Sequence, residues 1–248
     1  MDQIGATAGP LLVSAVLFFQ HQNYRVAYGI LIIPAIIAVS ILLYCRRLYP
    51  DPEKLEVRTT SIAATGFTIK YWIYVLAAVF IALGFTDFPL IAYHFKSTTL
   101  MSDSVIPLFY AVAMAGDAIA TLIFGKLYDR AGIKTLLVAV LLSSIFAPLV
   151  FMGGFNLALA GMVLWGIGLG AQESILKAEI AEMILPERRI TAFGTFHTAY
   201  GFFWFAGSAL MGYLYDFSIL YLIIFSVTTQ IISVIVISYL ILKKKQMS

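Results

Sequence analysis

The chain has 248 residues, of which 61% are hydrophobic and only 12% are charged, and its mean hydropathy is +0.94. Soluble domains are usually about 45–50% apolar and about 25% charged, so this composition excludes an ordinary soluble fold. The net charge of +3 is small, and the single cysteine, Cys45, excludes an intramolecular disulfide and a multi-cysteine metal site.

Eight apolar runs follow one another along the chain, and a membrane-spanning helix needs roughly 20 such residues. Met1-Asp2-Gln3 lacks the basic start of a cleavable signal peptide, so the first, short run is predicted to be a helix of the mature chain. Internal breakers such as Pro34 and Gly84 do not exclude helices, because in lipid the backbone must stay hydrogen-bonded and neighbouring helices repair the breaks. The predicted spans are 4–19, 26–45, 71–95, 104–125, 135–152, 157–176, 191–215 and 220–242.

Basic residues are concentrated on one side of the predicted membrane. If the helices alternate in direction, only Arg25 and Lys96 fall on the opposite side. The positive-inside rule places the richer side in the cytoplasm, so we predict a multi-pass protein of the plasma membrane with both chain ends cytoplasmic. The basic residues on that side are Arg46, Arg47, Lys54, Arg58, Lys70, Lys126, Arg130, Lys134, Lys177, Arg188, Arg189, Lys243, Lys244 and Lys245.

A short pattern, Gly-x-Leu-Tyr-Asp, ends both the fourth run (125–129) and the seventh run (212–216). The two copies of the pattern are 87 residues apart, and the same offset aligns the third run with the sixth and the fifth run with the eighth. Because each copy has three helices, the second copy would enter the membrane from the opposite side, as in the inverted repeats of many secondary transporters. The alternative is chance, combined with the frequency of Gly and Tyr near helix ends.

The repeat divides the chain into three predicted parts. Residues 1–45 hold the first two helices, and residues 46–70 form a polar, proline-containing cytoplasmic linker. Residues 71–248 form a six-helix bundle. The fold class is therefore all-α, with about eight transmembrane helices.

The loop after the fourth run resembles the signature Gly-x-x-x-Asp-Arg-x-Gly-x-Arg/Lys of the major facilitator superfamily. The matching residues are Gly125, Asp129, Arg130, Gly132 and Lys134. Positive-inside bias alone explains the two basic residues but not the two glycines together with the aspartate. Glycines allow close approach of helices, and the resemblance implies that these residues form a cytoplasmic gate.

The resemblance also implies how the chain maps onto the family's twelve helices. The superfamily has two six-helix halves, so this chain resembles the fifth to twelfth helices and lacks the first four. Pro186-Glu187-Arg188-Arg189 is similar to the Pro-Glu-x-Arg pattern between the family's tenth and eleventh helices. Gly5 to Pro10 partly resemble the antiporter motif of the fifth helix, but Val13-Ser14 replace its Gly-Gly pair, so antiport stays undecided.

Three acidic residues lie within predicted spans, where a charge is costly and marks a functional candidate. Asp117 lies near mid-depth of its span, where it can bind a proton or a solute, or serve as a buried packing group. Asp87 lies beside Gly84 and Pro89, where a broken helix would free carbonyls for a ligand; the alternative is a helix cap. Glu173 precedes Lys177 by four residues, a spacing that favours a local ion pair.

The seventh run adds an aromatic group to these candidates. Histidine as a residue type titrates near neutrality, which suits a proton relay, and His197 lies one turn before Tyr200 and two before Trp204. Packing among aromatic residues is the more common role of a single histidine. Trp204 aligns with Asp117 under the repeat. We therefore expect a transport cavity formed by Asp117, Asp87, Glu173, His197, Tyr200 and Trp204.

These observations favour secondary active or facilitative transport of a small solute by alternating access, with H⁺ or another ion as a possible coupling partner. The expected surroundings are the lipid bilayer and a separate four-helix fragment, with no nucleic acid and no cofactor; no Walker-type motif for ATP occurs. An intramembrane aspartyl protease is disfavoured because Met114 replaces the first glycine of Gly-x-Gly-Asp. A non-transporting scaffold or receptor, or a remnant of a split gene, remains the alternative.

Overall fold

The structure is a computed structural model that describes residues 2–20, 22–50 and 66–246. Most of the predicted linker, including Lys54 and Arg58, lies outside the described residues. The described part is helical, with one 3-10 turn, η2 (Pro186–Arg188). The helices are α1 (Asp2–Phe19), α2 (Tyr24–Ile30), α3 (Ile32–Leu48), α4 (Ile69–Gly84), α5 (Phe88–Ser97), α6 (Val105–Ala131), α7 (Lys134–Ser143), α8 (Phe146–Met152), α9 (Phe155–Met183), α10 (Arg189–Phe217) and α11 (Ile219–Gln246).

Three of the predicted spans are broken helices, and a proline explains each break. Pro34 lies four residues after Ile30, the last residue of α2, and Pro89 and Pro148 lie four residues after Phe85 and Ser144, the C-cap residues of α4 and α7. A proline ring clashes with the carbonyl four residues earlier and has no N–H to bond it, so the helix stops there. The pairs α2–α3, α4–α5 and α7–α8 each still act as one span.

The eight predicted spans therefore correspond to eight helical segments. Six are long and apolar enough to cross a membrane: Tyr24–Leu48, Ile69–Ser97, Val105–Ala131, Lys134–Met152, Phe155–Met183 and Ile219–Lys243. The remaining two are α1, which is shorter, and α10, which has 29 residues but carries glycine, threonine, tyrosine and histidine along its length.

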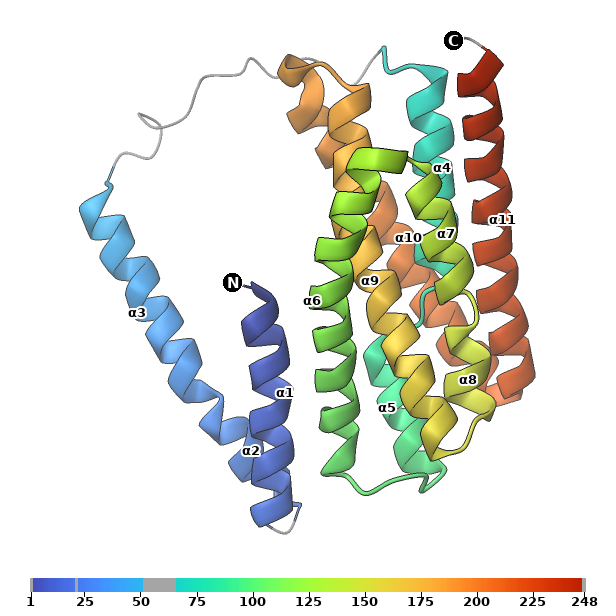
Figure 1. Cartoon of the computed structure of the whole chain (residues 1–248). Helices are drawn as coiled ribbons and strands as arrows, with labels where there is room; N and C mark the ends of the chain where they lie inside the picture. The colour runs from blue at the N-terminus through green and yellow to red at the C-terminus, as the bar shows by residue number, and fades with distance from the viewer. Residues whose placement is uncertain (1, 21, 51–65, 247–248) are drawn as a thin grey trace.

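Segments α4 to α11 form one bundle, shown in Figure 1. Helix α6 packs along α9, and α4 lies between α10 and α11. The helix bounds follow the predicted repeat: α4–α5 corresponds to α9, α6 to α10, and α7–α8 to α11. Figure 1 shows the members of each pair running in opposite directions, so the repeat is inverted as the sequence predicts.

The first helices meet this bundle along one side. Helix α1 packs against α6, where the Ser14 hydroxyl donates to the Ser104 carbonyl at 2.6 Å. Lys96 donates to Asp103 at 2.7 Å and lies over the Tyr24 ring. The Lys96 ammonium, and after it the Tyr24 hydroxyl, lowers the pKa of the Asp103 carboxyl. Helix α3 stands apart from the bundle in Figure 1 and has no buried residue.

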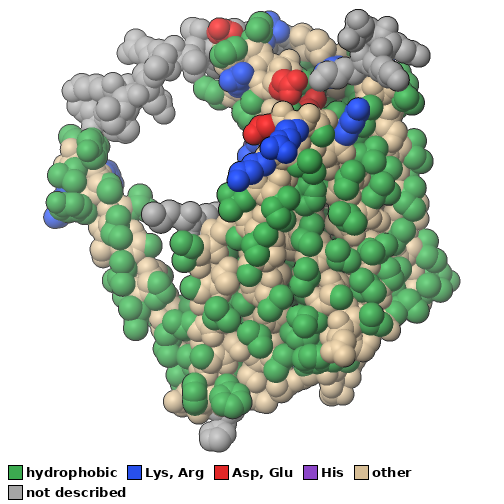
Figure 2. Space-filling view, viewed as in Figure 1, with side chains coloured by type: hydrophobic (Ala, Val, Ile, Leu, Met, Phe, Trp, Pro, Cys, Tyr) green, Lys and Arg blue, Asp and Glu red, His purple; other side chains and the backbone are tan. Residues whose placement is uncertain are grey.

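Charge is distributed unevenly over the surface. In Figure 2, Lys, Arg, Asp and Glu side chains gather near the top of the view, where α6 and α9 end, while hydrophobic side chains cover the lower part. Such an apolar surface is what contact with lipid tails tolerates. The fold is that of an all-α membrane bundle.

Candidate functional site

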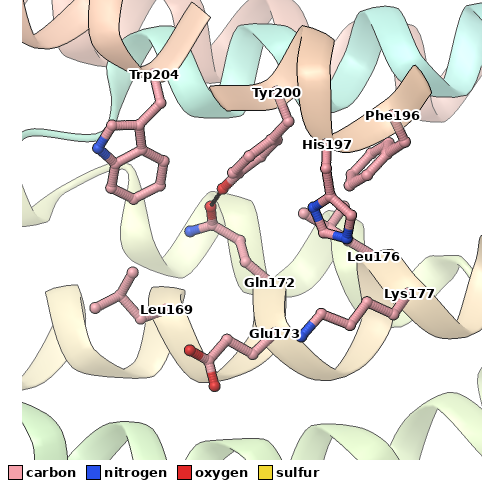
Figure 3. A pocket seen from close by; sticks show the side chains of 9 residues that line it. All are labelled: Leu169, Gln172, Glu173, Leu176, Lys177, Phe196, His197, Tyr200 and Trp204. Carbon is pink, nitrogen blue, oxygen red and sulfur yellow. Dashed lines mark hydrogen bonds between the residues drawn. The ribbon is translucent and has the colours of Figure 1, made fainter. Parts of the chain in front are cut away.

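A pocket of ≈ 190 Å³ lies between α9 and α10, as Figure 3 shows. Four of the six predicted cavity residues line it: Glu173, His197, Tyr200 and Trp204. Its other lining residues are Leu169, Gln172, Leu176, Lys177 and Phe196. Asp117 and Asp87 lie elsewhere.

Gln172 and Tyr200 close the inner wall of the pocket. The Tyr200 hydroxyl donates to the Gln172 side-chain oxygen at 2.6 Å, as the dashed line in Figure 3 shows. The Gln172 amide in turn donates to the Gly168 carbonyl at 2.9 Å. Both polar groups are therefore occupied within the protein. Sequence reasoning missed Gln172, although a buried glutamine within a span is a detectable signal.

Glu173 and Lys177 lie one turn apart on the pocket wall. The expected ion pair between them is not formed in the described part of the chain. Instead, the Gln3 amide of α1 donates to Glu173 at 2.9 Å, so this carboxylate joins α1 to α9. The sequence could not show this, because the partner is 170 residues away.

His197 reaches from α10 toward α9, above Lys177 in Figure 3. Its ring stacks on Phe193 and meets Phe196 edge to face. Within the described residues, neither ring nitrogen of His197 has a hydrogen-bond partner. The structure thus shows the predicted aromatic packing and leaves both nitrogens available for a ligand.

Asp87 lies at the break between α4 and α5, at the N-cap position of α5. Its side chain makes no capping hydrogen bond there. Its carboxylate accepts instead from the Trp204 indole N–H and the Ser208 hydroxyl of α10. Because Trp204 also lines the pocket, Asp87 lies one residue behind the pocket wall.

The carbonyls at this break are only partly available. The Trp165 indole donates to the Thr86 carbonyl at 2.8 Å, and the Ser226 hydroxyl donates to the Gly84 carbonyl at 2.6 Å. The expectation that the broken helix leaves these carbonyls to a ligand is therefore wrong for these two residues. Side chains of α9 and α11 satisfy them, which fixes the break within the bundle.

Asp117 lies in the interface between α6 and α9 and is only 3% exposed. The Thr121 hydroxyl lies 3.3 Å from its carboxylate. A Cβ added to Gly170 of α9 would come within 2.8 Å of the same carboxylate, so the two helices meet closely here. The structure places Asp117 among packed helices, outside the pocket lining.

The signature residues lie at the charged end of the bundle. Asp129 and Arg130 are exposed at the end of α6, and neither forms a hydrogen bond or ion pair with another described residue. Gly132 has φ +59° and ψ −145°, a conformation that essentially only glycine adopts, and this explains its place in the loop. Space beside Gly125 is open, so the predicted close approach is not seen there. Exposed Lys134 begins α7.

Arg189, in the Pro-Glu-Arg-Arg segment, has a structural role. Its guanidinium donates to the Ala181 carbonyl at 2.7 Å and to the Ile184 carbonyl at 3.1 Å. These carbonyls belong to the end of α9, where the last helical turn has no partners of its own. Arg189 therefore caps α9 and joins it to the start of α10.

The tyrosine of each repeat pattern forms a contact that the sequence did not indicate. The Tyr128 hydroxyl lies 2.7 Å from the buried carboxylate of Glu179 and 2.8 Å from that of Glu182, both on α9. The Tyr215 hydroxyl lies 3.0 Å from the ring of buried His94 of α5. Each tyrosine thus crosses to the first helix of the other repeat, which is the reciprocal arrangement that an inverted repeat produces.

Known proteins similar to the chain agree with this architecture. Uncharacterized proteins from two strains of Mycobacterium tuberculosis and from Mycobacterium bovis are 33% identical over 241 residues, or 95% of this chain. The chain spans only 59% of the length of these relatives. A crystal structure of a bacterial homologue of the iron transporter ferroportin, in its outward-facing state, matches 96% of this chain and 60% of its own, with a TM-score of 0.58 and 20% identity. That likeness shows the fold alone.

The family itself is shown by a direct match. The family model of the Major Facilitator Superfamily covers residues 71–248, which are the six-helix bundle from α4 to α11. This match agrees with the signature after α6, with the inverted repeat and with the solved fold. The chain is a membrane protein and belongs to the Major Facilitator Superfamily.

Proposed function

We propose that this protein carries a small solute across the plasma membrane by alternating access, as a secondary active or facilitative transporter with both chain ends in the cytoplasm. The observation that carries the proposal is the α9–α10 pocket, in which Glu173, Lys177 and His197 line a cavity within a membrane-spanning bundle. Ionisable groups at such positions are costly, and they are typical of solute and ion pathways. The family and its fold are typically non-enzymatic.

Asp117 is our candidate for proton coupling. An ionised carboxylate buried between two helices in a membrane is costly, so binding a proton lowers the cost of burial. The packing of α6 against Gly170 makes Asp117 sensitive to movement of α9. Protonation of Asp117 would thereby couple to the shape of the adjacent pocket. Asp129 and Arg130, exposed at the end of α6, would form the cytoplasmic gate when the bundles close.

Alternating access is testable without knowing the solute, because a pocket residue must become accessible from each side in turn. Cys45→Ser gives a cysteine-free chain, into which His197→Cys is introduced. An impermeant maleimide added to right-side-out and inside-out vesicles should label His197→Cys from both sides. Ile235→Cys, exposed on the outside of α11, is the control and should stay unlabelled in lipid. Labelling of His197→Cys from one side only would favour a static scaffold.

A further inference from the structure

We propose that the α9–α10 pocket binds a small zwitterionic solute of the amino-acid class, with its carboxylate toward Lys177 and His197 and its ammonium toward Glu173. This inference rests on the proposed function, because it names the solute class of the same pocket. It is drawn from the charges and sizes of the lining side chains.

The first observation is that opposite charges share one wall of the pocket. Glu173 and Lys177 are four residues apart on α9 and both line the cavity. They form no ion pair with each other in the described part of the chain. The Gln3 amide donates to one oxygen of the Glu173 carboxylate. The other Glu173 oxygen and the Lys177 ammonium have no hydrogen-bond partner among the described residues, and a solute can bind to them. A solute with only one charge would face a like charge from the other residue, whereas a zwitterion matches both.

The second observation concerns the carboxylate end of the solute. His197 extends over Lys177 from the opposite helix, as Figure 3 shows, so two donors converge between α9 and α10. A lysine ammonium and an imidazole N–H both donate hydrogen bonds to a carboxylate. Hydrogen bonds to charged groups are stronger than neutral ones.

The third observation concerns size and the apolar remainder of the lining. The volume of ≈ 190 Å³ lies below the range of roughly 300–1,000 Å³ that is typical of drug-sized ligands. Leu169, Leu176 and Phe196 supply an apolar surface beside the charged residues. A small solute with one apolar side chain fits this combination. A bare metal cation does not, because the Lys177 ammonium would repel it.

Three isosteric probes separate the contribution of each charge. L-leucine carries both charges, 3-methylbutylamine lacks the carboxylate, and 4-methylpentanoate lacks the ammonium. Binding is measured calorimetrically with the full chain in lipid nanodiscs. Leucine should bind, and each analogue should bind about ten- to hundredfold more weakly, because a hydrogen bond to a charged group contributes about 1.5–3 kcal/mol.

Two variants should weaken this preference, each for a different charge of the solute. Lys177→Gln removes one of the two donors to the carboxylate, so the preference for leucine over 3-methylbutylamine should fall to what His197 alone supports. Glu173→Gln removes the partner of the ammonium, so 4-methylpentanoate should then match leucine. Both side chains are exposed, so both variants should fold, and each one's binding to its matching analogue confirms this. Equal weakening of all three probes in both variants would show that the charges serve each other, and would overturn the inference.

The result also separates this inference from the proposed function. If none of the three probes binds while Fe²⁺ does, or while His197→Cys is still labelled from both sides, the solute class is wrong and transport stands. If no probe binds and labelling is confined to one side, both proposals fail. Leucine binding with labelling from both sides supports both.

Discussion

Helix α9 presents two different faces to its neighbours. Toward α6 it places glycines: a Cβ on Gly166 would lie 2.0 Å from the Ala113 carbonyl oxygen, and one on Gly170 would lie 2.4 Å from that of Asp117. Toward α10 it places larger side chains such as Gln172 and Lys177, and the pocket lies there. Small residues allow membrane helices to pack backbone to backbone, and large polar ones hold them apart. Residue size along one helix thus decides where the bundle is closed and where it leaves room for a solute.

The largest effect is expected in the closely packed interface between α6 and α9, where a substitution at Asp117 tests whether this interface also contributes to transport. Asp117→Asn has nearly the same shape and still accepts from Thr121, so the α6–α9 packing should be kept. Because the proton-binding group is lost, proton-coupled uptake should be abolished. Uptake into proteoliposomes under an imposed pH gradient, together with its pH dependence, measures this. Unchanged uptake and unchanged pH dependence would leave Asp117 as a packing residue.

The next prediction addresses the glycines directly. Gly166→Ala places a methyl group against the Ala113 backbone, so α6 and α9 must separate, and overpacking of this kind costs about 1–3 kcal/mol or more. Gly194→Ala on α10 has nothing within 4 Å, and it should stabilise the helix by about 0.5–1 kcal/mol. Thermal unfolding in detergent measures both variants. Changes of the same sign in the two would contradict the difference between the faces.

A smaller effect is expected where α10 is tied to the broken helix. Asp87→Ala leaves the Trp204 indole and the Ser208 hydroxyl without their acceptor, at a cost of about 1–3 kcal/mol. This loss of stability measures the hydrogen bonds from α10 and not a helix cap, because the Asp87 side chain makes no capping hydrogen bond in α5. Asp129→Ala is the matched control, since that side chain is exposed. It should leave the unfolding temperature unchanged and impair only transport.

The sequence was sufficient for the fold because the fold depends on local patterns. Run lengths predicted the spans, the Gly-x-Leu-Tyr-Asp pattern predicted the inverted repeat, and Gly125 to Lys134 pointed to the family that the comparison then showed. Broken helices were harder to foresee, since a proline breaks some spans whereas Pro10 lies inside an unbroken α1.

The site was predicted only in part, because its geometry depends on distant partners. His197, Tyr200 and Trp204 follow one another by helical turns, so one face of α10 was predictable. Which carboxylate faces that helix was not predictable. Asp117 and Glu173 look alike in sequence, yet the first is buried against α6 and the second opens on the pocket. Only the rotation of each helix in the bundle decides between these outcomes.

The smallest expected effect lies on the open face of α9. Tyr200→Phe removes the hydroxyl that donates to Gln172, a single hydrogen bond that contributes about 0.5–1.5 kcal/mol. The effect should fall at the low end, because water entering the pocket can replace the lost hydroxyl, whereas no water can reach between Gly166 and Ala113. Tyr213→Phe is the control, because the Tyr213 side chain is 61% exposed. The unfolding temperature of this variant should equal that of the unchanged protein. The Tyr200→Phe variant could instead lose as much stability against unfolding as Gly166→Ala does. The α10 face of α9 would then be packed as firmly as the α6 face, and the pocket would be part of the closed core.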